Sequence, residues 1–511
     1  MPTFGFLIDN RKCIGCHACT VACKSEHEVP LGVDRTWVKY IEKGQFPNNR
    51  RLFTVMRCNH CEYAPCITIC PVTSLYRRDD GVVDFNPQRC IGCKACMQAC
   101  PYDALHIDPD SHTAAKCNFC THRLEVGLEP SCVVVCPEQA IVCGDLDDSQ
   151  SRISQLIERH PVQVRKPEKG TKPKLYYIDG DEAALVPGRT SANGGQMWSR
   201  TDDGTSRPAQ GPRATNGEGD FLSIRKPEPQ RVYDVRPRAP AWGWPVVAYT
   251  WTKSIASGAV LGVVAARLLG GSGPAEAISS WMGSVALLFL LITTGLLVGD
   301  LKRPERFLFV LLRPQWKSWL VRGAYCLVAY SLLVTCWLAA RLVGVTALAD
   351  LLLWPAALLA VPTAVYTAFL FAQAKGRDLW QNPLLSAHLL AHALLAGGAA
   401  WLLIGNVAAG ADVDAARAFT LVMLAVSLLT TFGEVLTVHP TEDSRRAMAM
   451  IVGAPLGGSF WGGGILIGHV LPIVLLACGV ALTWLAPLLI LIGMLAIERA
   501  WVLAPQRIAL S

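Results

Sequence analysis

The chain has 511 residues, of which 51% are hydrophobic and 17% are charged, and its formal net charge is +7. Its mean hydropathy of +0.31 is too high for an ordinary soluble protein, and its 20 cysteines are too many for an ordinary membrane protein. Only three of the cysteines, Cys326, Cys336 and Cys478, follow residue 143. The averages therefore combine two unlike regions, and they exclude collagen-like, coiled-coil and wholly disordered chains.

The first region, residues 1–143, contains four cysteine motifs of the spacing C-x2-C-x2-C-x3-C or a variant with a longer middle step. A cubane cluster needs four thiolates, and a tight loop of three cysteines can wrap three of its irons while the fourth cysteine reaches a neighbouring cluster. We therefore predict a ferredoxin-like α+β domain with four [4Fe–4S] clusters. Its sixteen expected ligands are Cys13, Cys16, Cys19, Cys23, Cys58, Cys61, Cys66, Cys70, Cys90, Cys93, Cys96, Cys100, Cys117, Cys120, Cys132 and Cys136.

Two other uses of these cysteines are less compatible with the sequence. The start of the chain, MPTFGFLIDNRKC, has no features of a signal peptide, and a disulfide framework would require export. A zinc site would suit Cys117-x2-Cys120 in isolation, but three neighbouring motifs and the Cys-Pro pairs after three of the four motifs favour iron–sulfur ligation. Cys143 is left over, and we expect it to be a small buried residue.

Residues 144–240 are rich in Pro, Gly, Arg, Ser and Thr, a composition that buries too little apolar surface to order itself. We interpret them as a polar linker and docking arm, with one strand-like segment at Lys174–Ile178.

Residues 241–511 form an expected all-α domain of eight membrane spans, because their apolar runs are about 20 residues long. We place the spans at 246–269, 281–299, 319–342, 350–373, 385–405, 416–437, 463–482 and 486–503. Glycine pairs such as Gly295-x3-Gly299 and Gly464-x3-Gly468 indicate close helix packing.

The basic residues of the loops indicate the orientation of these spans. Eleven lie on the side of both termini, against Arg267, Arg341 and Arg417 on the other side. We therefore expect the cysteine domain on the cytoplasmic face of a bacterial inner membrane. The positive charge then reports membrane orientation, and we expect no nucleic-acid partner. The eleven are Lys302, Arg303, Arg306, Arg313, Lys317, Lys375, Arg377, Arg445, Arg446, Arg499 and Arg507.

Taken together, the motifs carry a resemblance to two families. The segments CIGCHACTVACKSEHEVPLGV, CNHCEYAPCITICP and CIGCKACMQACP resemble the four-cluster iron–sulfur subunit of the DMSO reductase, polysulfide reductase and sulfite dehydrogenase group. The segment LVGDLKRPERF, with Trp316–Arg322, and the loop His439–Asp443 resemble the NrfD/DmsC-type membrane anchor. These subunits are usually separate polypeptides in the families, whereas here they are fused.

The resemblance implies how the cysteines are shared among the clusters and which partner is missing. It pairs the first motif with the fourth and the second with the third. It further implies a large catalytic partner with a molybdenum bis-pterin cofactor, for which this chain has no recognisable site. The implied ligand sets are Cys13, Cys16, Cys19 and Cys136; Cys117, Cys120, Cys132 and Cys23; Cys58, Cys61, Cys66 and Cys100; and Cys90, Cys93, Cys96 and Cys70.

Ionisable side chains within the spans are candidates for a quinone and proton site, because burying them in a membrane is costly. His388 and His392 lie one turn apart on one helical face and suit hydrogen bonding to quinone oxygens, with Tyr249, Tyr325 or Tyr366 as helpers. Asp300 is a further ionisable candidate at a span boundary. Glu434 suits proton exchange with water. Lys253 is a further candidate, although snorkelling to the interface would also explain it. Haem ligation by the histidines is the alternative, and the resemblance argues against haem.

These observations predict an electron-transfer and membrane-anchor subunit of a molybdenum oxidoreductase that exchanges electrons with menaquinone or ubiquinone in the lipid. The expected cytoplasmic orientation favours sulfite:quinone oxidoreduction. The alternatives are a quinol-dependent reductase of DMSO, thiosulfate or polysulfide, a redox-coupled proton-translocating module, and a membrane-tethered ferredoxin without a catalytic partner.

Overall fold

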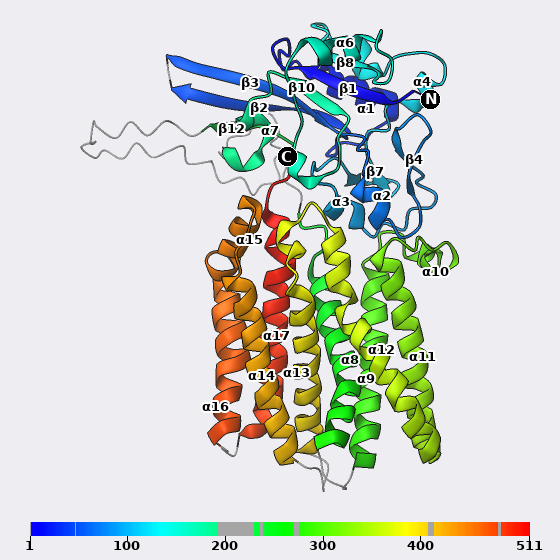
Figure 1. Ribbon diagram of the computed structural model, residues 1–511, viewed down its shortest axis with the longest axis vertical. Coiled ribbons are helices and arrows are strands. Elements are labelled where there is room, and N and C mark those ends of the chain that lie inside the picture. Colours follow the sequence, from blue (N-terminus) through cyan, green and yellow to red (C-terminus); the bar gives the residue numbers. More distant parts are fainter. Residues whose placement is uncertain are drawn as a thin grey trace, which may run out of the picture.

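The computed structural model describes residues 2–45, 47–192, 229–235, 239–269, 275–406, 413–478 and 482–511. An α+β part rests on one end of an all-helical part, and both chain termini lie at the α+β end (Figure 1). The predicted fold class is confirmed, as is the placement of both termini on one side of the helical part.

The sheet at the centre of the α+β part has the strand order β8-β1-β10-β9. The central strand β1 is an almost continuously buried run, as expected for a strand covered on both faces. It pairs in parallel with β10 and antiparallel with β8. The strands are β1 (Phe4–Asp9), β8 (Ile141–Asp145), β9 (Val162–Gln163) and β10 (Leu175–Ile178).

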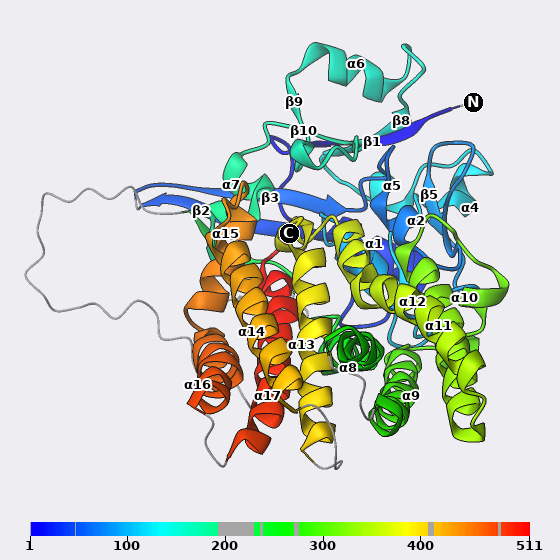
Figure 2. The same cartoon turned by 60° about the horizontal axis from the view of Figure 1, so that its bottom comes forward.

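A second sheet has the order β11-β12-β2-β3 and is built on a long hairpin of β2 and β3 (Figure 2). Two short hairpins, β4–β5 and β6–β7, follow the second and third cysteine motifs. The strands are β2 (Thr36–Gln45), β3 (Asn48–Arg57), β4 (Leu75–Arg77), β5 (Val83–Phe85), β6 (His106–Ile107), β7 (Ala114–Ala115), β11 (Ser191–Ala192) and β12 (Gln230–Tyr233).

Short helices carry the later cysteines of each motif, which fixes their thiols relative to the preceding loop. Cys19 and Cys23 lie on α1, Cys66 on α2, Cys96 on α3 and Cys132 on α5. The helices are α1 (Ala18–His27), α2 (Pro65–Ile69), α3 (Ala95–Ala99), α4 (Thr121–Leu124), α5 (Ser131–Val134), α6 (Arg152–Arg159) and α7 (Glu182–Leu185).

The polar region after residue 143 contributes structure to the α+β part in its first fifty residues. Strand β10 pairs with β1, and α6 packs beside β8 through Ile153. The strand expected at Lys174–Ile178 corresponds to β10. The predicted division at residues 143 and 240 stays a prediction, and residues 193–228 of the expected arm lie outside the described residues.

The helical part contains eight helices that are long and apolar enough to cross a membrane, counted among the described residues. This confirms the predicted number of spans. The first six in chain order are α-helices throughout, whereas the seventh begins as a π-helix, Gly458–Val470, and continues as α16. The eighth, Thr483–Arg507, consists of α17 with a short 3-10 turn at each end. The α-helices are α8 (Trp244–Leu269), α9 (Ala275–Gly299), α11 (Trp319–Val343), α12 (Thr346–Gln373), α13 (Leu385–Gly405), α14 (Val413–Leu436), α16 (Leu471–Cys478) and α17 (Ala486–Leu503).

Close helix contacts occur at some of the glycines that the sequence indicated and not at others. A Cβ added to Gly468 would lie 2.5 Å from the Cα of Gly493 in α17, whereas one added to Gly295 or Gly299 would meet no atom within 4 Å. The predicted packing role is therefore wrong for Gly295 and Gly299, because that face of α9 meets no neighbouring helix in the described part of the chain.

Loops of the helical part hold the α+β part through backbone hydrogen bonds. Lys302 and Arg303, after α9, donate their backbone N–H groups to the carbonyls of Gly92 and Ile91 over 3.3 and 3.2 Å. Gly376, after α12, donates to the carbonyl of Gln98 over 3.1 Å. Two short helices, α10 (Phe309–Leu312) and α15 (Glu442–Val452), lie at this same end (Figure 1). The third cysteine motif is thereby seated directly on the helical part.

Candidate functional site

The cysteines of the first motif face one cysteine of the fourth. Cys13, Cys16, Cys19 and Cys136 together line one cavity. Burial raises the pKa of the Cys13 thiol, and the Cys136 thiol adds to this rise. Three cysteines of the first motif and the last cysteine of the fourth motif, which follows α5, therefore surround a single volume, as one cluster requires.

The remaining cysteine of the first motif, Cys23, faces the fourth motif. Burial raises the pKa of the Cys23 thiol, and the nearby thiols of Cys117, Cys132 and Cys120 raise it further. The exchange of the last cysteine between these two motifs gives a second group of four, Cys23 with Cys117, Cys120 and Cys132.

The second and third motifs exchange their last cysteines in the same way. Burial raises the pKa of Cys61 to about 12, and the Cys58 and Cys100 thiols contribute to this rise. Burial likewise raises the pKa of Cys93 to about 12, and there Cys70 and Cys90 contribute. Burial also raises the pKa of Cys66, and Cys100 and Cys58 add to this rise. The pKa of Cys96 is raised by burial and by Cys93, Cys90 and Cys70.

These surroundings fit iron–sulfur clusters chemically. Buried thiols with raised pKa values are protonated in the free chain, and iron binding would replace those protons and supply the missing positive charge. Buried hydrogen-bond donors near the thiols also lack partners among the described residues, namely Nε and Nη2 of Arg57 and Nε2 of His60. The sulfur atoms of a cluster accept such bonds. The individual ligand sets nevertheless stay predictions.

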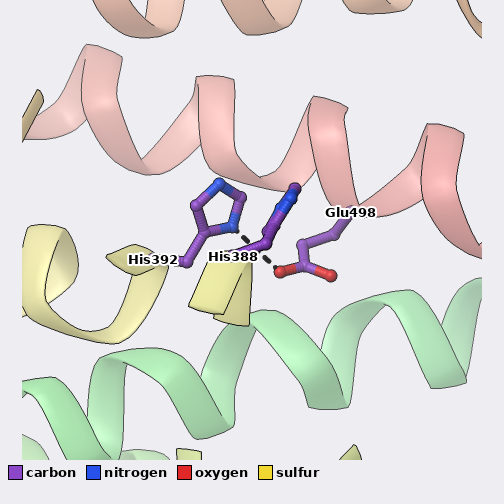
Figure 3. A group of neighbouring side chains, drawn as sticks. All are labelled: His388, His392 and Glu498. Carbon is purple, nitrogen blue, oxygen red and sulfur yellow. Dashed lines mark hydrogen bonds and ion pairs between the residues drawn. The ribbon is translucent and has the colours of Figure 1, made fainter. Parts of the chain in front are cut away.

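Within the helical part, the two predicted histidines form separate buried pairs with carboxylates. His388 and Glu434 share a hydrogen bond of 2.7 Å between Nδ1 and Oε2, and His392 and Glu498 share one of 3.0 Å between Nδ1 and Oε1. All four side chains are at most 3% exposed. Figure 3 shows His392 and His388, from α13, directed toward Glu498, from α17.

The structure joins these pairs into one group. The imidazole centroids of His388 and His392 are 4.2 Å apart. One ligand atom each from His388, His392 and Glu498 lies within 4.8 Å of the others. The group is buried beneath the α+β part and contains two carboxylates and two groups able to carry a proton, so it can store and exchange protons.

The predicted residue Lys253, on α8, is fully buried and does not snorkel. Its Nζ donates to the carbonyl of Ala364 over 2.8 Å and to Oγ1 of Thr367 over 2.6 Å. The same nitrogen lies 4.5 Å from the ring centroid of Tyr366. Lys253 therefore links α8, which packs against the histidine helix α13, to α12, the helix that carries Tyr366.

A separate apolar cavity of about 420 Å³ lies between α8, α9, α11 and α12. Its upper wall contains Cys93, and Trp242 donates its indole N–H to the Cys93 carbonyl over 3.1 Å. The polar groups in its lining include Tyr249, Asp300 and Tyr366. The volume and the small number of polar groups in an apolar lining are typical of a small-molecule site.

This cavity reaches the lipid-facing surface between α9 and α11. Leu291 on α9 and Leu332 on α11 line it and are 65% and 63% exposed. At the opposite end, Asp300 forms an ion pair of 2.8 Å with Lys94, which lies within the third cysteine motif. Burial raises the pKa of Asp300, although Lys94 opposes this effect.

Of the residues predicted for quinone and proton chemistry, Tyr249, Tyr366 and Asp300 line the cavity. His388, His392 and Glu434 lie in the buried histidine–carboxylate group instead, and Lys253 contacts Ala364, Thr367 and the Tyr366 ring. Sequence reasoning missed Glu498, although a carboxylate inside the span predicted at 486–503 is itself a signal of a functional group. The adjacent Arg499, counted with the basic residues of the loops, suggested that this end of the span lies at the membrane interface. The contact between Trp242 and Cys93 joins residues 149 positions apart, and no local pattern reveals it.

The family assignment follows from the helical part. The sequence model described as polysulphide reductase, NrfD, matches residues 235–508, which is more than half of the chain. The protein belongs to the NrfD family. A second match, to a 4Fe–4S dicluster domain, covers residues 50–146. The protein is therefore a fusion of a 4Fe–4S ferredoxin-type subunit with an NrfD-family membrane anchor.

Similarity to individual proteins lies on the iron–sulfur side. A tetrathionate reductase subunit of Salmonella typhimurium is 43% identical over 189 residues, 36% of this chain and 75% of that protein. A polysulfide reductase chain of Wolinella succinogenes is 41% identical over 187 residues, 36% of this chain and 97% of that protein. A putative dimethyl sulfoxide reductase iron–sulfur subunit of Halobacterium salinarum is 35% identical over 271 residues, 47% of this chain and 97% of that protein. This NrfD-family fusion is thus an electron-transfer and membrane-anchor subunit of an oxidoreductase complex.

Proposed function

We propose that this chain carries electrons between a membrane quinone and a molybdenum-containing catalytic subunit. The observation that carries the proposal is the cavity whose wall contains Cys93 and whose other end faces lipid through Leu291 and Leu332. A quinone ring in this cavity would lie beside a cluster ligand, while its apolar tail would leave between α9 and α11. When bound, the four clusters would supply one-electron carriers that connect this cavity with the partner.

The cavity supplies the groups that a quinone ring requires. The hydroxyls of Tyr249 and Tyr366 can donate to quinone oxygens, and the carboxylate of Asp300 can accept a hydrogen bond from a quinol hydroxyl. Lys94 holds Asp300 in place through their ion pair. Trp242 connects the backbone of Cys93 to the same wall.

The neighbouring polar group is suited to proton exchange. Oxidation of a quinol releases two electrons and two protons, and each proton needs an acceptor near the ring. Lys253 lies against the Tyr366 ring, and two histidine–carboxylate pairs lie in the same bundle. We assign Lys253, His388, His392, Glu434 and the newly found Glu498 to this proton exchange, and Tyr366 to ring binding.

The substrate of the partner is proposed from the relatives. Three of them are named as subunits of tetrathionate, polysulfide and dimethyl sulfoxide reductases, which favours reduction of a sulfur compound with electrons from quinol. Sulfite oxidation, favoured by the expected orientation alone, stays a prediction. The excess of basic residues at the α+β end of the spans supports a cytoplasmic position for the clusters.

The cavity can be tested by filling it in the full chain. Ser331 lines the cavity on α11, whereas Cys336 on the same helix is exposed and outside the lining. Reduction of the clusters by a soluble quinol is followed by their visible absorbance, with dithionite reduction as a measure of intact clusters. We expect Ser331→Trp to slow quinol-driven reduction by about tenfold or more, while Cys336→Trp and dithionite reduction stay normal. Normal quinol oxidation by Ser331→Trp would contradict the proposed cavity.

The proton assignment has its own test. A His388→Ala/His392→Ala double variant removes both imidazoles of the buried group while leaving the cavity lining unchanged. We expect quinol-driven cluster reduction to slow and its pH dependence to change. An unchanged rate and pH profile would remove the histidines from the mechanism without affecting the cavity assignment.

A further inference from the structure

Arg57 is a fully buried cation at the end of β3, and it lies among cysteines of two different groups. Its Nη1 donates a hydrogen bond of 3.2 Å to Sγ of Cys132. Burial alone would lower the pKa of the guanidinium, but the neighbouring cysteines Cys132, Cys117 and Cys19 raise it by more. Cys132 and Cys117 belong to one proposed cluster and Cys19 to the other.

The arginine has no conventional counterion. In the part of the chain that the structure describes, no carboxylate lies within 4.0 Å of Arg57, and Nε and Nη2 have no hydrogen-bond partner. Burying an unpaired charge is costly unless an anion and hydrogen-bond acceptors are supplied. Clusters ligated by four thiolates provide both, because they carry net negative charge and their sulfur atoms accept hydrogen bonds.

Packing fixes the guanidinium in this position. Its central carbon lies 4.4 Å from the ring centroid of Phe6, and Phe6 stacks on Phe119 with centroids 3.9 Å apart. A cation–π contact of this kind orients a planar guanidinium more strictly than a flexible ammonium. The positive charge therefore has a defined location beside the Cys132 thiol.

We infer that Arg57 sets the reduction potentials of two of the four clusters, those held by Cys117, Cys120, Cys132 and Cys23 and by Cys13, Cys16, Cys19 and Cys136. The inference rests on the proposed function and on the ligand sets predicted for the four clusters. Each cluster gains one negative charge when it accepts an electron, and a fixed cation in a medium of low dielectric constant stabilises that charge. Charge and hydrogen bonds to sulfur are established determinants of cluster potentials. Arg57 thus raises both potentials, and the cluster with Cys132 is affected more strongly because it also receives the hydrogen bond.

The test is a potentiometric titration of the full chain in detergent, followed by electron paramagnetic resonance, with iron content measured on the same samples. The variants are Arg57→Gln, which removes the charge, and Arg57→Lys, which keeps the charge and loses the planar donors. Arg51→Gln is the matched control, because Arg51 lies on the same strand and pairs with Glu42 at the surface.

We expect Arg57→Gln to lower two of the four midpoint potentials and to leave the other two unchanged. The larger shift should reach at least a tenfold change in the reduction equilibrium, which is 59 mV for one electron. Arg57→Lys keeps the charge and loses the planar donors, so it should lower mainly the midpoint of the cluster with Cys132, and Arg51→Gln should change none. Four unchanged midpoints with full iron content in Arg57→Gln or Arg57→Lys would overturn the inference, as would equal shifts of all four.

The iron measurement separates this inference from the proposed function. If the unsubstituted chain lacks four reducible clusters, the ligand sets are wrong and the inference fails with them. If Arg57→Gln loses the iron of two clusters, the Arg57→Lys midpoints decide, because that variant retains the buried charge. A lowered midpoint of the cluster with Cys132 in Arg57→Lys supports the inference, and four unchanged midpoints overturn it.

Discussion

Replacing Lys39 by methionine should stabilise the α+β part, because this lysine is buried without a counterion. Lys39 lies in β2 with its side chain fully buried, and its Nζ has no hydrogen-bond partner among the described residues. Burial lowers its pKa from 10.5 to about 7; Asp234 opposes this effect, while Arg165 adds to it. At about 1.36 kcal/mol for each pKa unit, burying the charged form costs up to about 5 kcal/mol.

The pH dependence distinguishes charge from packing. Between about pH 7 and about pH 10.5 the unfolded chain holds a proton on Lys39 that the folded chain has lost, so stability rises with pH across that window. The cost is therefore full below about pH 7 and disappears near pH 10.5. Lys39→Met should be more stable than the unsubstituted chain by up to about 5 kcal/mol at pH 7, and the gain should shrink as the pH approaches 10.

Urea unfolding of the full chain in detergent, followed by loss of the cluster absorbance, measures this difference. For a slope of about 2–3 kcal/mol per molar urea, a gain of about 5 kcal/mol would raise the midpoint by about 1.7–2.5 M at pH 7. Lys43→Met is the control, since Lys43 lies on the same strand at the surface and pairs with Asp181; its effect should stay within about 0.5 kcal/mol. An equal gain at pH 7 and at pH 10, or no gain at pH 7, would refute the proposed cost of burying the Lys39 charge.

Two further predictions concern the clusters and the bundle. Cys70→Ser should remove about a quarter of the iron, as loss of one of four clusters requires, whereas Cys143→Ser should retain all of it; metal analysis checks both, and equal iron in the two variants would contradict the ligand sets. Gly258→Val should destabilise the crossing of α8 and α13 by at least about 3 kcal/mol, because a Cβ there would lie 2.0 Å from the Ala393 carbonyl oxygen. Gly295→Val, where no atom lies within 4 Å, should leave the thermal midpoint in detergent nearly unchanged, and similar midpoints for the two variants would argue against the crossing.

Local chemistry made much of this protein predictable. Four thiolates per cluster impose strict spacings, so the sixteen cysteines from Cys13 to Cys136 could be predicted as ligands without a fold. Hydrocarbon thickness imposes a minimum span length, and the helix expected at 246–269 is found at Trp244–Leu269. Both constraints act on residues close together in the chain, which is why the sequence expresses them directly.

The sequence by itself thus determined two things, an iron–sulfur part and eight membrane helices, with His388, His392, Glu434 and Lys253 as costly buried groups. Only the tertiary structure decided which groups meet. It paired His392 with Glu498, 106 positions away, placed Tyr366 in the cavity apart from the histidines, and set Arg57 among thiols of two motifs. Such contacts depend on how helices and strands pack, and the packing of distant segments leaves no periodic signal in the chain.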